Sequence, residues 1–481
     1  MSYWPWTILV AATEVAAFVA ILSILRRPRE PRAMLAWILA LLLMPGIGLV
    51  LFLLIGERRM LRHQRRRRRR RKPLTGPLTR KAEALQSREL IESRQAPAAG
   101  VRQLMALAER LGSFPATSKN EVTVFHDAER TFLALQLAIE AAESHVHLEY
   151  YIFQPDETGT AVADLLIAKA RQGVACRLLL DFVGCWRLSR KFVRRLRKAG
   201  VQVAFAMPVL PWRGRWRVNF RNHRKIAVID GRVGFTGSQN IGDEYRGRRA
   251  RISPWRDTHL RIVGPGVHHL QEVFVEDWHY TTKEDLVTDE YFPIPEAQGL
   301  HTVQVVPSGP DQPIHVTHRV VFAAIQAARS SIHVITPYFV PDAAVVVALQ
   351  AAAYRGVEVC LIIPTLTDQR VVLWAGRSFY EPLCRAGVDI YEHDETMLHS
   401  KVMIVDREWA MVGSANMDER SFRINFEVST MLYSMGLAEE LYDDLTALRE
   451  RSRRIHVSDL EARSYLESIG VGLARLASPL L

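Results

Sequence analysis

Two stretches of the chain decide how its fold is read: "RNHRKIAVIDGRVGFTGSQN" at residues 221–240 and "MLHSKVMIVDREWAMVGSAN" at residues 397–416. Each reads His-x-Lys, four residues, Asp, and then Gly-Ser-x-Asn at the same offset, and the two copies lie 176 residues apart. A duplication with this long a period predicts two homologous domains and not a solenoid of short repeats.

The repeat extends upstream of each cassette. Residues 145–181 and 331–364 both read as a strand, a Pro-Asp turn, an amphipathic helix and a second apolar strand, with Gly173 and Gly356 where each helix should stop. This is the pattern of a parallel βαβ unit. We therefore predict two α/β domains with mixed sheets flanked by helices, at residues 106–295 and 296–481, related by a pseudo-twofold axis.

Each cassette predicts a strand, a tight turn and a returning strand. Side chains two residues apart on a strand share a face, so each histidine and its lysine point the same way. The aspartates lie seven residues after their histidines, at the predicted turn, where ordering the turn is the more natural role. They still complete the repeated motif. The candidate catalytic residues are His223, Lys225, Asp230, His399, Lys401 and Asp406.

The returning strand of each hairpin brings a hydroxyl and a carboxamide back beside the histidine and lysine. These supporting residues, expected to bind phosphate, are Ser238, Asn240, Ser414 and Asn416. Attack and leaving-group protonation on opposite sides of a phosphorus need two imidazoles, whereas one half supplies only one. The sequence therefore predicts that both halves build one site, in which two lysines and two asparagines hold the developing negative charge.

With these motifs in place, the chain resembles the phospholipase D superfamily, defined by paired H-x-K-x4-D motifs. More closely it resembles the bacterial cardiolipin synthases of that superfamily. The segments that carry the closer resemblance are "NFRNHRKIAVIDG", "GFTGSQNIGDEY", "WRDTHLRI", "FVEDW", "SGPD", "TPYFVPD" and "GSANMDERSFRINFE", together with the apolar stretch "AWILALLLMPGIGLVLFLLIGE". They cover nearly the whole chain apart from residues 73–105.

The resemblance implies a covalent phosphohistidine, no metal and no cofactor, and an acidic residue behind each histidine. Glu427, 28 residues after His399, matches the family's acid in the second half. Arg251 stands at that spacing in the first half, so Asp257 is the candidate there. Which histidine attacks is left open by the near symmetry, and analogy favours His223.

The amino-terminal arm predicts a membrane anchor. Residues 3–25 are apolar apart from Glu14, and residues 33–56 carry no charge. Each is long enough to cross the hydrocarbon core, so residues 1–56 are expected to form a two-helix transmembrane hairpin with spans at about 3–25 and 33–55. A signal peptide is the rival for the first stretch, but it lacks a basic start and a second apolar stretch follows at once.

The net charge of +12 belongs entirely to residues 1–72, so the other 409 residues are neutral overall. That distribution disfavours a nucleic-acid partner. Residues 57–105 are expected to be a basic juxtamembrane segment and linker, and the run from Arg58 to Lys72 is expected to contact anionic headgroups. Eleven Lys and Arg there, against four between the spans, predict an inner-membrane, multi-pass protein with cytoplasmic catalytic domains.

The resemblance implies the conversion of two phosphatidylglycerols into cardiolipin and glycerol, with the bilayer as partner. Lipid hydrolysis or exchange with another alcohol is the nearest alternative, because the acceptor depends on how the pocket excludes water. A tethered nuclease would want a basic groove, and a non-catalytic scaffold would not need both motifs intact. Acyl preference, oligomeric state and the role of Glu14 are not decided by the sequence.

Overall fold

The computed structural model describes residues 4–26, 31–55, 99–209, 219–248, 255–295, 299–312 and 314–478. Contacts divide the chain into two units, residues 1–70 with 209–219, and residues 71–208 with 220–481. The run from Arg58 to Lys72, predicted to contact headgroups, lies outside the described residues.

The first unit contains three apolar helices, α1 (Trp4–Leu25), α2 (Pro31–Leu43) and α3 (Pro45–Ile55). In the described part of the chain, one helix is long and apolar enough to cross a membrane, over Trp6–Leu25. The second predicted span, over 33–55, is divided at Met44 into α2 and α3. Pro45 has no N–H to donate and its ring clashes with the preceding turn, which ends α2 and starts α3.

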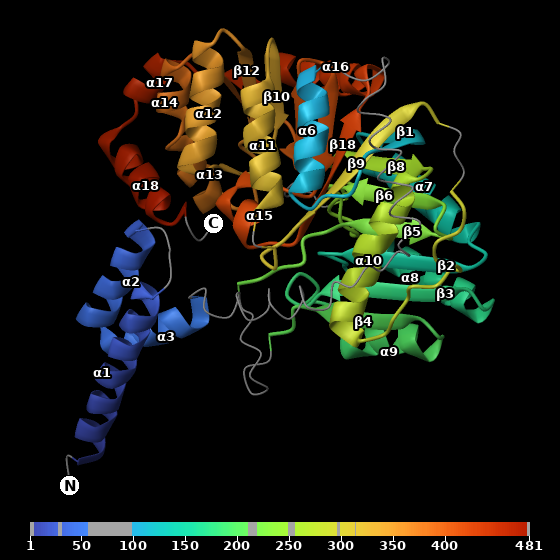
Figure 1. The fold of residues 1–481 in the computed structure, drawn as a ribbon, viewed down its shortest axis with the longest axis horizontal. Coiled ribbons are helices and arrows are strands. Elements are labelled where there is room, and N and C mark those ends of the chain that lie inside the picture. Colours follow the sequence, from blue (N-terminus) through green and yellow to red (C-terminus); the bar gives the residue numbers. More distant parts are fainter. Residues whose placement is uncertain are drawn as a thin grey trace. The chain divides into compact units, whose positions relative to one another are not determined.

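The second unit is built on a 15-stranded sheet in the order β19-β13-β12-β10-β15-β16-β18-β9-β1-β8-β6-β5-β2-β3-β4. The order from β9 to β13 repeats that from β1 to β4, strand for strand. The halves join where β1 (Thr117–Phe125) pairs antiparallel with β9 (His301–Ser308). This is the predicted architecture of two homologous α/β halves with pseudo-twofold symmetry (Figure 1).

The two halves have matching elements. The first half continues with α7 (Ala128–Glu140), β2 (His145–Tyr150), α8 (Glu157–Arg171), β3 (Ala175–Asp181), α9 (Arg190–Lys198), β4 (Gln202–Ala206), β5 (Ile226–Ile229), β6 (Val233–Gly237), β7 (Trp255–Arg256), β8 (His259–Val263) and α10 (Gly266–Thr282). The second continues with α11 (Val316–Ala327), β10 (Ser331–Ile335), β11 (Phe339–Val340), α12 (Ala343–Tyr354), β12 (Glu358–Pro364), α13 (Arg370–Arg377), α14 (Tyr380–Arg385), β13 (Asp389–His393), β14 (Met397–Leu398), β15 (Val402–Val405), β16 (Trp409–Gly413), β17 (Met417–Asp418), α15 (Glu419–Arg423), β18 (Glu427–Tyr433) and α16 (Met435–Glu450). The chain then adds β19 (Arg453–Arg454), α17 (Val457–Glu461) and α18 (Tyr465–Leu476).

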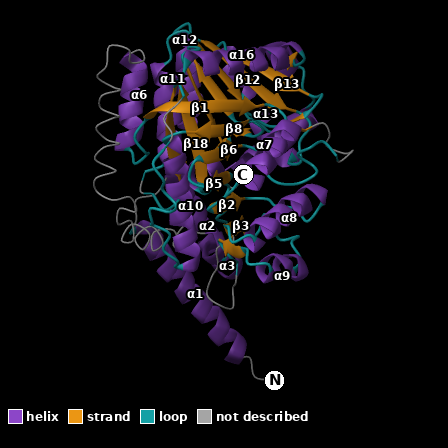
Figure 2. Ribbon diagram, turned by 90° about the vertical axis from the view of Figure 1, so that its right-hand side faces the viewer, coloured by secondary structure: helices purple, strands orange, loops and turns teal. Residues whose placement is uncertain are grey.

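Helices lie on both sides of the strands (Figure 2). One apolar cluster joins α7, α8 and α9 to the first half's strands, and a second joins α11, α12 and α13 to the second half's strands. A third contains strand residues of both halves together with α10 and α16. Since that third cluster has members from each half, burial of apolar surface holds the halves together as one body.

Local sequence explains the βαβ units. The carboxylates of Asp156 and Asp342, from the two Pro-Asp turns, accept hydrogen bonds from the backbone N–H groups of Gly159 and Val345 and so cap α8 and α12. Gly173 and Gly356 follow those helices with φ of 95° and 86°. The predicted helix stops are thus confirmed, because only glycine adopts this region without strain.

One helix lies inside the range predicted to be linker. The α6 helix (Ala99–Arg110) buries Val101, Leu104 and Met105 in the apolar cluster of the second half, beside α11 (Figure 1). Gln304 on β9 fixes the following segment, since its side-chain amide donates to the carbonyl of Phe114 at 2.9 Å. The chain therefore contacts the second half before it enters the first.

Candidate active site

The two His-x-Lys pairs occupy equivalent places, directly before β5 and β15. His223, Lys225, His399 and Lys401 are all buried. Each ammonium donates to the carbonyl of its own histidine, Lys225 Nζ at 2.6 Å and Lys401 Nζ at 2.5 Å. A lysine bonded in this way points back along the chain toward its imidazole, so each half presents the ring and the cation side by side, as the shared strand face predicted.

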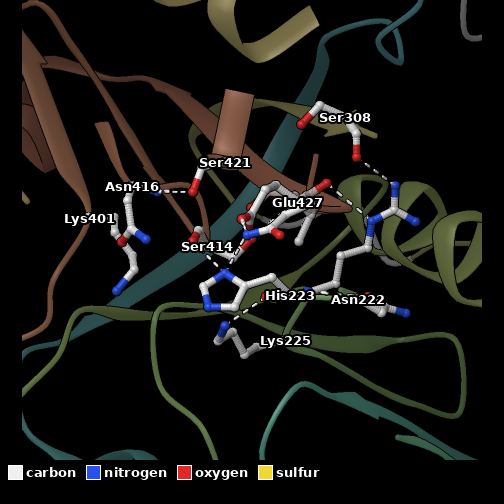
Figure 3. Close-up of polar contacts among 12 residues, drawn as sticks. Asn222, His223, Lys225, Ser308, Lys401, Ser414, Asn416, Ser421 and Glu427 are labelled. Carbon is white, nitrogen blue, oxygen red and sulfur yellow. Dashed lines mark hydrogen bonds and ion pairs between the residues drawn. The ribbon is translucent and has the colours of Figure 1, made fainter. Parts of the chain in front are cut away.

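His223 is held by the other half. A parallel bridge pairs Asn222 with Phe426, and the His223 N–H donates to the Phe426 carbonyl at 2.9 Å. This places the imidazole Nδ1 3.0 Å from Glu427 Oε2 and 3.1 Å from the Ser414 carbonyl (Figure 3). Both neighbours accept, so Nδ1 carries the proton and Nε2 keeps its lone pair in the neutral ring.

His399 is held in the same way by the first half. Strand β7 pairs in parallel with β14, and the His399 N–H donates to the Arg256 carbonyl at 2.7 Å. Its Nδ1 lies 2.8 Å from Asp257 Oδ1. Sequence analysis placed Glu427 and Asp257 each behind the histidine of its own half. The structure corrects that pairing: each acid orients the histidine of the opposite half, because the short strand bridges run between the halves.

Burial and the neighbouring charges favour neutral imidazoles on the two histidines and ionised carboxylates on the acids that face them. Burial lowers the pKa of His223 to about 4, and burial also lowers the pKa of His399. Burial opposes ionisation of Glu427, but His223 and the nearby ammonium of Lys225 keep its pKa below the ordinary value. An imidazole that is neutral at physiological pH has the form needed for nucleophilic attack.

The two lysines share this buried position and repel extra positive charge. Burial lowers the pKa of Lys225 to about 8 and that of Lys401 to about 7. Lys225 also contributes to the lowering at Lys401, since the two ammonium groups lie close enough to interact. A site that holds two buried ammonium groups close together is suited to bind an anion.

The two carboxylates that orient the imidazoles accept hydrogen bonds from different sets of donors. Glu427 accepts from the Ser414 hydroxyl at 2.5 Å and from the Asn425 side-chain amide at 3.2 Å, in addition to His223. Asp257 accepts from the Trp255 indole N–H at 2.7 Å besides His399. The Ser238 hydroxyl, which matches that of Ser414, donates instead to the Thr258 carbonyl at 2.9 Å. The negative charge of Glu427 is therefore shared with two neutral hydrogen-bond donors, Ser414 and Asn425, as well as with His223.

Aromatic side chains line the imidazoles. The Tyr151 ring packs edge-on against His223 with centroids 4.7 Å apart, and the Lys225 ammonium lies 5.4 Å from the same ring. Trp255 packs 5.3 Å from His399, with Tyr245 beyond it. Sequence reasoning did not find Tyr151, although its position directly after β2 was a usable signal.

Asp230 and Asp406 do not lie with the imidazoles. Asp230 follows β5, so four strand residues, about 13 Å, separate it from the His-x-Lys pair. Its carboxylate accepts from the backbone N–H groups of Glu143, Ser144 and His145, each at 2.8 Å. Asp406 likewise accepts from the backbone of residues 329–331. Their placement among the catalytic residues is corrected: both aspartates anchor the loop that leads into the neighbouring strand.

The serines and asparagines return beside the histidines as the hairpins predicted, with β5–β6 and β15–β16 paired antiparallel. Asn240 binds within the protein: its Oδ1 accepts from the Ile152 N–H at 3.1 Å and its Nδ2 donates to the Tyr245 hydroxyl at 3.1 Å. Asn416 differs, because its buried Oδ1 has no hydrogen-bond partner. The two carboxamides are therefore not equivalent.

A buried polar network lies behind His223, and the equivalent positions of the second half do not repeat it. Asn222 donates to Glu149 at 2.6 Å, and Arg224 binds Asp277 and donates to the Ser308 carbonyl at 3.2 Å. Burial, followed by the charge of Asp277, raises the pKa of Glu149 well above its usual value, so Glu149 is neutral.

The second half has Ile335, Leu398 and Ser400 at the positions of Glu149, Asn222 and Arg224. Sequence analysis did not detect this asymmetry, because only one copy of the repeat carries it.

Within the described residues, no group of three or more His, Cys, Asp or Glu side chains is placed to hold a metal ion. Cys176 and Cys360 are buried in equivalent strands of the two halves.

Comparison with known proteins identifies the family. The model of the cardiolipin synthase, phospholipase D-like domain matches residues 135–278 and 321–449, and a phospholipase D-nuclease N-terminal model matches residues 15–57. The chain is 38% identical to a cardiolipin synthase of Alkalihalophilus pseudofirmus, covering 100% of this chain and 95% of that protein. It is 40% identical to a cardiolipin synthase of Geobacillus kaustophilus, covering 96% and 92%.

Among solved structures, the phosphatidylserine synthase of Haemophilus influenzae superposes with a TM-score of 0.58 at 12% identity. The match covers 79% of this chain and 100% of that one, which supports the shared fold. The family models, the full-length relatives and the paired histidine site all indicate the same family. The chain belongs to the cardiolipin synthase family of phospholipase D-like phosphatidyltransferases.

Proposed function

We propose that this protein transfers a phosphatidyl group from one phosphatidylglycerol to another, giving cardiolipin and glycerol. The observation that carries the proposal is the pair of buried imidazoles, each held through Nδ1 by a carboxylate of the opposite half. Both Nε2 atoms are then available for a displacement with one ring on each side of a phosphorus. Phosphatidylglycerol serves as both donor and acceptor, because its headgroup carries free hydroxyls.

The first step forms a phosphohistidine. The neutral Nε2 of His223 attacks the phosphorus of the first phosphatidylglycerol, and the bond from phosphorus to the glycerol oxygen breaks. The bound phosphodiester anion stabilises the imidazolium form of His399, which gives its Nε2 proton to that oxygen, and glycerol leaves. Lys225 and Lys401 stabilise the charge on the non-bridging oxygens, where a low-dielectric site makes fixed cations most effective.

The second step reverses the roles. The now neutral His399 takes a proton from a hydroxyl of the second phosphatidylglycerol, whose oxygen attacks the phosphorus. The bond from phosphorus to His223 breaks, and cardiolipin is released with both histidines restored. One phosphodiester replaces another, so the cycle needs no nucleotide.

The assignment of attack to His223 rests on the unequal carboxylates. Glu427 is shared among His223, Ser414 and Asn425, which leaves less charge to stabilise an imidazolium on His223. The charge and hydrogen bond of His399, followed by Lys401 and the Ser238 hydroxyl, hold the pKa of Asp257 well below the usual value in spite of burial. An ionised Asp257 holds His399 in the protonated form that can donate, and leaves His223 as the neutral nucleophile.

The amino-terminal helices supply the membrane context. The 22 residues of α1 extend about 33 Å, enough to cross the hydrocarbon core. We infer that α2 and α3, 13 and 11 residues long, form a second, broken passage. The excess of Lys and Arg after residue 57 then places the catalytic halves on the cytoplasmic side of the inner membrane.

Purified full-length protein in detergent, given phosphatidylglycerol alone with a chelator and no nucleotide, tests the reaction by lipid mass spectrometry. Cardiolipin and glycerol in equal amounts are expected. Phosphatidic acid as the main product would show that water is the acceptor and would make the protein a hydrolase. Cardiolipin formed only after a different phospholipid is added would reassign the donor. A variant with His223→Ala and His399→Ala is the control for contaminating activity.

A further inference from the structure

A concentrated basic surface lies on the first half, although the chain outside residues 1–72 is neutral overall. The segment from Phe182 to Val201 contains seven Lys and Arg and no Asp or Glu. We define the α9 patch as the exposed indole and the exposed basic residues of this segment apart from Arg195, which pairs with Asp164: Trp186, Arg187, Arg190, Lys191, Arg194, Arg197 and Lys198. Trp186 is 73% exposed, which is unusual for so large an apolar side chain. Positive charge and an exposed indole therefore occupy one surface.

Grooves flank α9 on both sides. Between α8 and α9 the lining includes Arg171, Lys191 and Lys198, with Asp164 as a counter-charge bound to Arg195. On the other side, the patch borders an apolar lining that includes Phe182, Leu188 and Phe205. A surface that presents cations beside apolar side chains matches the boundary between lipid headgroups and acyl chains.

The α9 patch is joined directly to the active site. The Asp181 carboxylate accepts from the backbone N–H groups of Val183 and Gly184 at 2.9 and 2.8 Å, and from that of Asn222 at 2.8 Å. The Cys185 thiol donates to the carbonyl of Tyr151, whose ring packs on His223. The loop that carries Trp186 is thus tied to both segments that position the imidazole.

The equivalent region of the second half is also unusual. There α13 and α14 connect β12 to β13, as α9 connects β3 to β4. Gly470 on α18 packs against the Trp374 ring, so α18 lies on α13. Val371 is 53%, Leu466 79% and Leu473 62% exposed. Val371 lies in the connection that the pseudo-twofold symmetry matches to α9, and α18 adds Leu466 and Leu473 to the exposed apolar surface of that half.

We propose that the α9 patch rests on the surface of an anionic bilayer and holds the active-site side of the body against the lipid. Charge complementarity favours anionic headgroups, and each basic side chain at such a surface contributes about fivefold to partitioning. The apolar lining beside the cations and the exposed aliphatic side chains of the second half favour lipid over nucleic acid, which is bound by charge and aromatic stacking. This contact does not depend on the reaction proposed above.

Fluorescence quenching in proteoliposomes tests the contact without turnover. The full-length chain carries Lys191→Cys labelled with bimane, and the parent chain gives the background from half-buried Cys384. Vesicles contain a headgroup-nitroxide lipid in phosphatidylcholine, with or without phosphatidic acid. The test variant is Arg194→Glu with Lys198→Glu. The control is Arg110→Glu with Arg319→Glu, which changes the net charge equally at exposed helix positions of α6 and α11.

We expect phosphatidic acid to increase quenching several-fold in the labelled Lys191→Cys chain and in the control chain, and to have no effect on the labelled chain that also carries Arg194→Glu and Lys198→Glu. High salt should reverse the increase, since exposed charges are screened. The proposal is overturned if phosphatidic acid changes nothing, or if both pairs of substitutions act equally. A rise in bimane anisotropy with an oligonucleotide, without lipid-dependent quenching, would reassign the patch to nucleic acid. None of these results depends on cardiolipin formation.

Discussion

The Nδ1 atom of His223 lies 3.0 Å from the carboxylate of Glu427, a residue 204 positions further along the chain and in the other half of the molecule. His399 and Asp257 repeat the relationship in the opposite direction. Neither half can orient its own histidine, so the catalytic unit is the pair. This explains why one chain carries the cassette twice and why separation of the halves would abolish both imidazole geometries.

Replacing Glu427 by Gln should stop catalysis with little change in fold. The Gln amide would donate to Nδ1 of His223 and move the ring proton to Nε2, which removes the nucleophilic lone pair. A fall in kcat on the order of 10⁴-fold is expected, the size seen when a supporting carboxylate elsewhere is changed to an amide. Steady-state kinetics check it, with thermal unfolding as the control. A loss below tenfold would contradict the tautomer argument.

On the alkaline side, the activity should decline at a lower pH than the ordinary pKa of a lysine would predict. The pKa of Lys401 is about 7 and that of Lys225 about 8, and the protonated forms are the ones that bind the phosphodiester. Thus kcat/KM should decline as pH rises, first as His399 loses the proton that it must donate and then as the two lysines lose theirs, and on the acid side as His223 gains a proton near pH 4. Lys401→Arg should shift the alkaline decline of kcat/KM to higher pH. An unchanged profile would show that deprotonation of Lys401 does not cause the decline.

Asp406 should matter for stability and not for chemistry. Asp406→Ala leaves the N–H groups of Arg329, Ser330 and Ser331 without their acceptor, which should lower the free energy of unfolding by about 1–3 kcal/mol. Asp406→Asn keeps one acceptor oxygen and tolerates the residue's φ of 54°. We expect both folded variants to keep kcat within a few-fold of the parent in detergent assays. A kcat loss like that of a histidine variant would restore Asp406 to the catalytic set.

Replacing the two acids of the buried network behind His223 should lower the stability of the protein by unequal amounts. Asp277→Ala leaves the Arg224 guanidinium buried without its carboxylate, a loss of about 3–5 kcal/mol. Glu149→Gln should cost little, because Glu149 is already neutral in the folded protein. Thermal unfolding of the two variants compares them directly. Equal destabilisation would mean that Glu149 is ionised and that the arrangement of charges differs from the one described.

The repeated motifs were sufficient to predict the halves, the hairpins and the position of each His-x-Lys pair, since strand periodicity and turn residues act locally. The crossed acid pairing was not predictable in this way. It depends on the bridge from Asn222 to Phe426 and on the pairing of β7 with β14, contacts between distant segments that no local pattern encodes.

Other features were missed for different reasons. A count of net charge hides the α9 patch, because acidic residues elsewhere cancel it. Hydropathy alone read residues 33–55 as one span, although Pro45 divides it into two helices. The network of Glu149, Arg224 and Asp277 joins three separate elements of the first half, so its members become a group only in the folded chain.

The most direct test of the central claim is to locate the covalent intermediate. Full-length protein is mixed with phosphatidylglycerol, quenched without acid and digested, and the phosphatidyl adduct is mapped by mass spectrometry. The account predicts the adduct on His223 in the parent chain, none in a His223→Asn chain, and no cardiolipin from a His399→Asn chain, which lacks the acid of the first step and the base of the second. An adduct on His399, or cardiolipin made at the parent rate by either variant, would contradict the account.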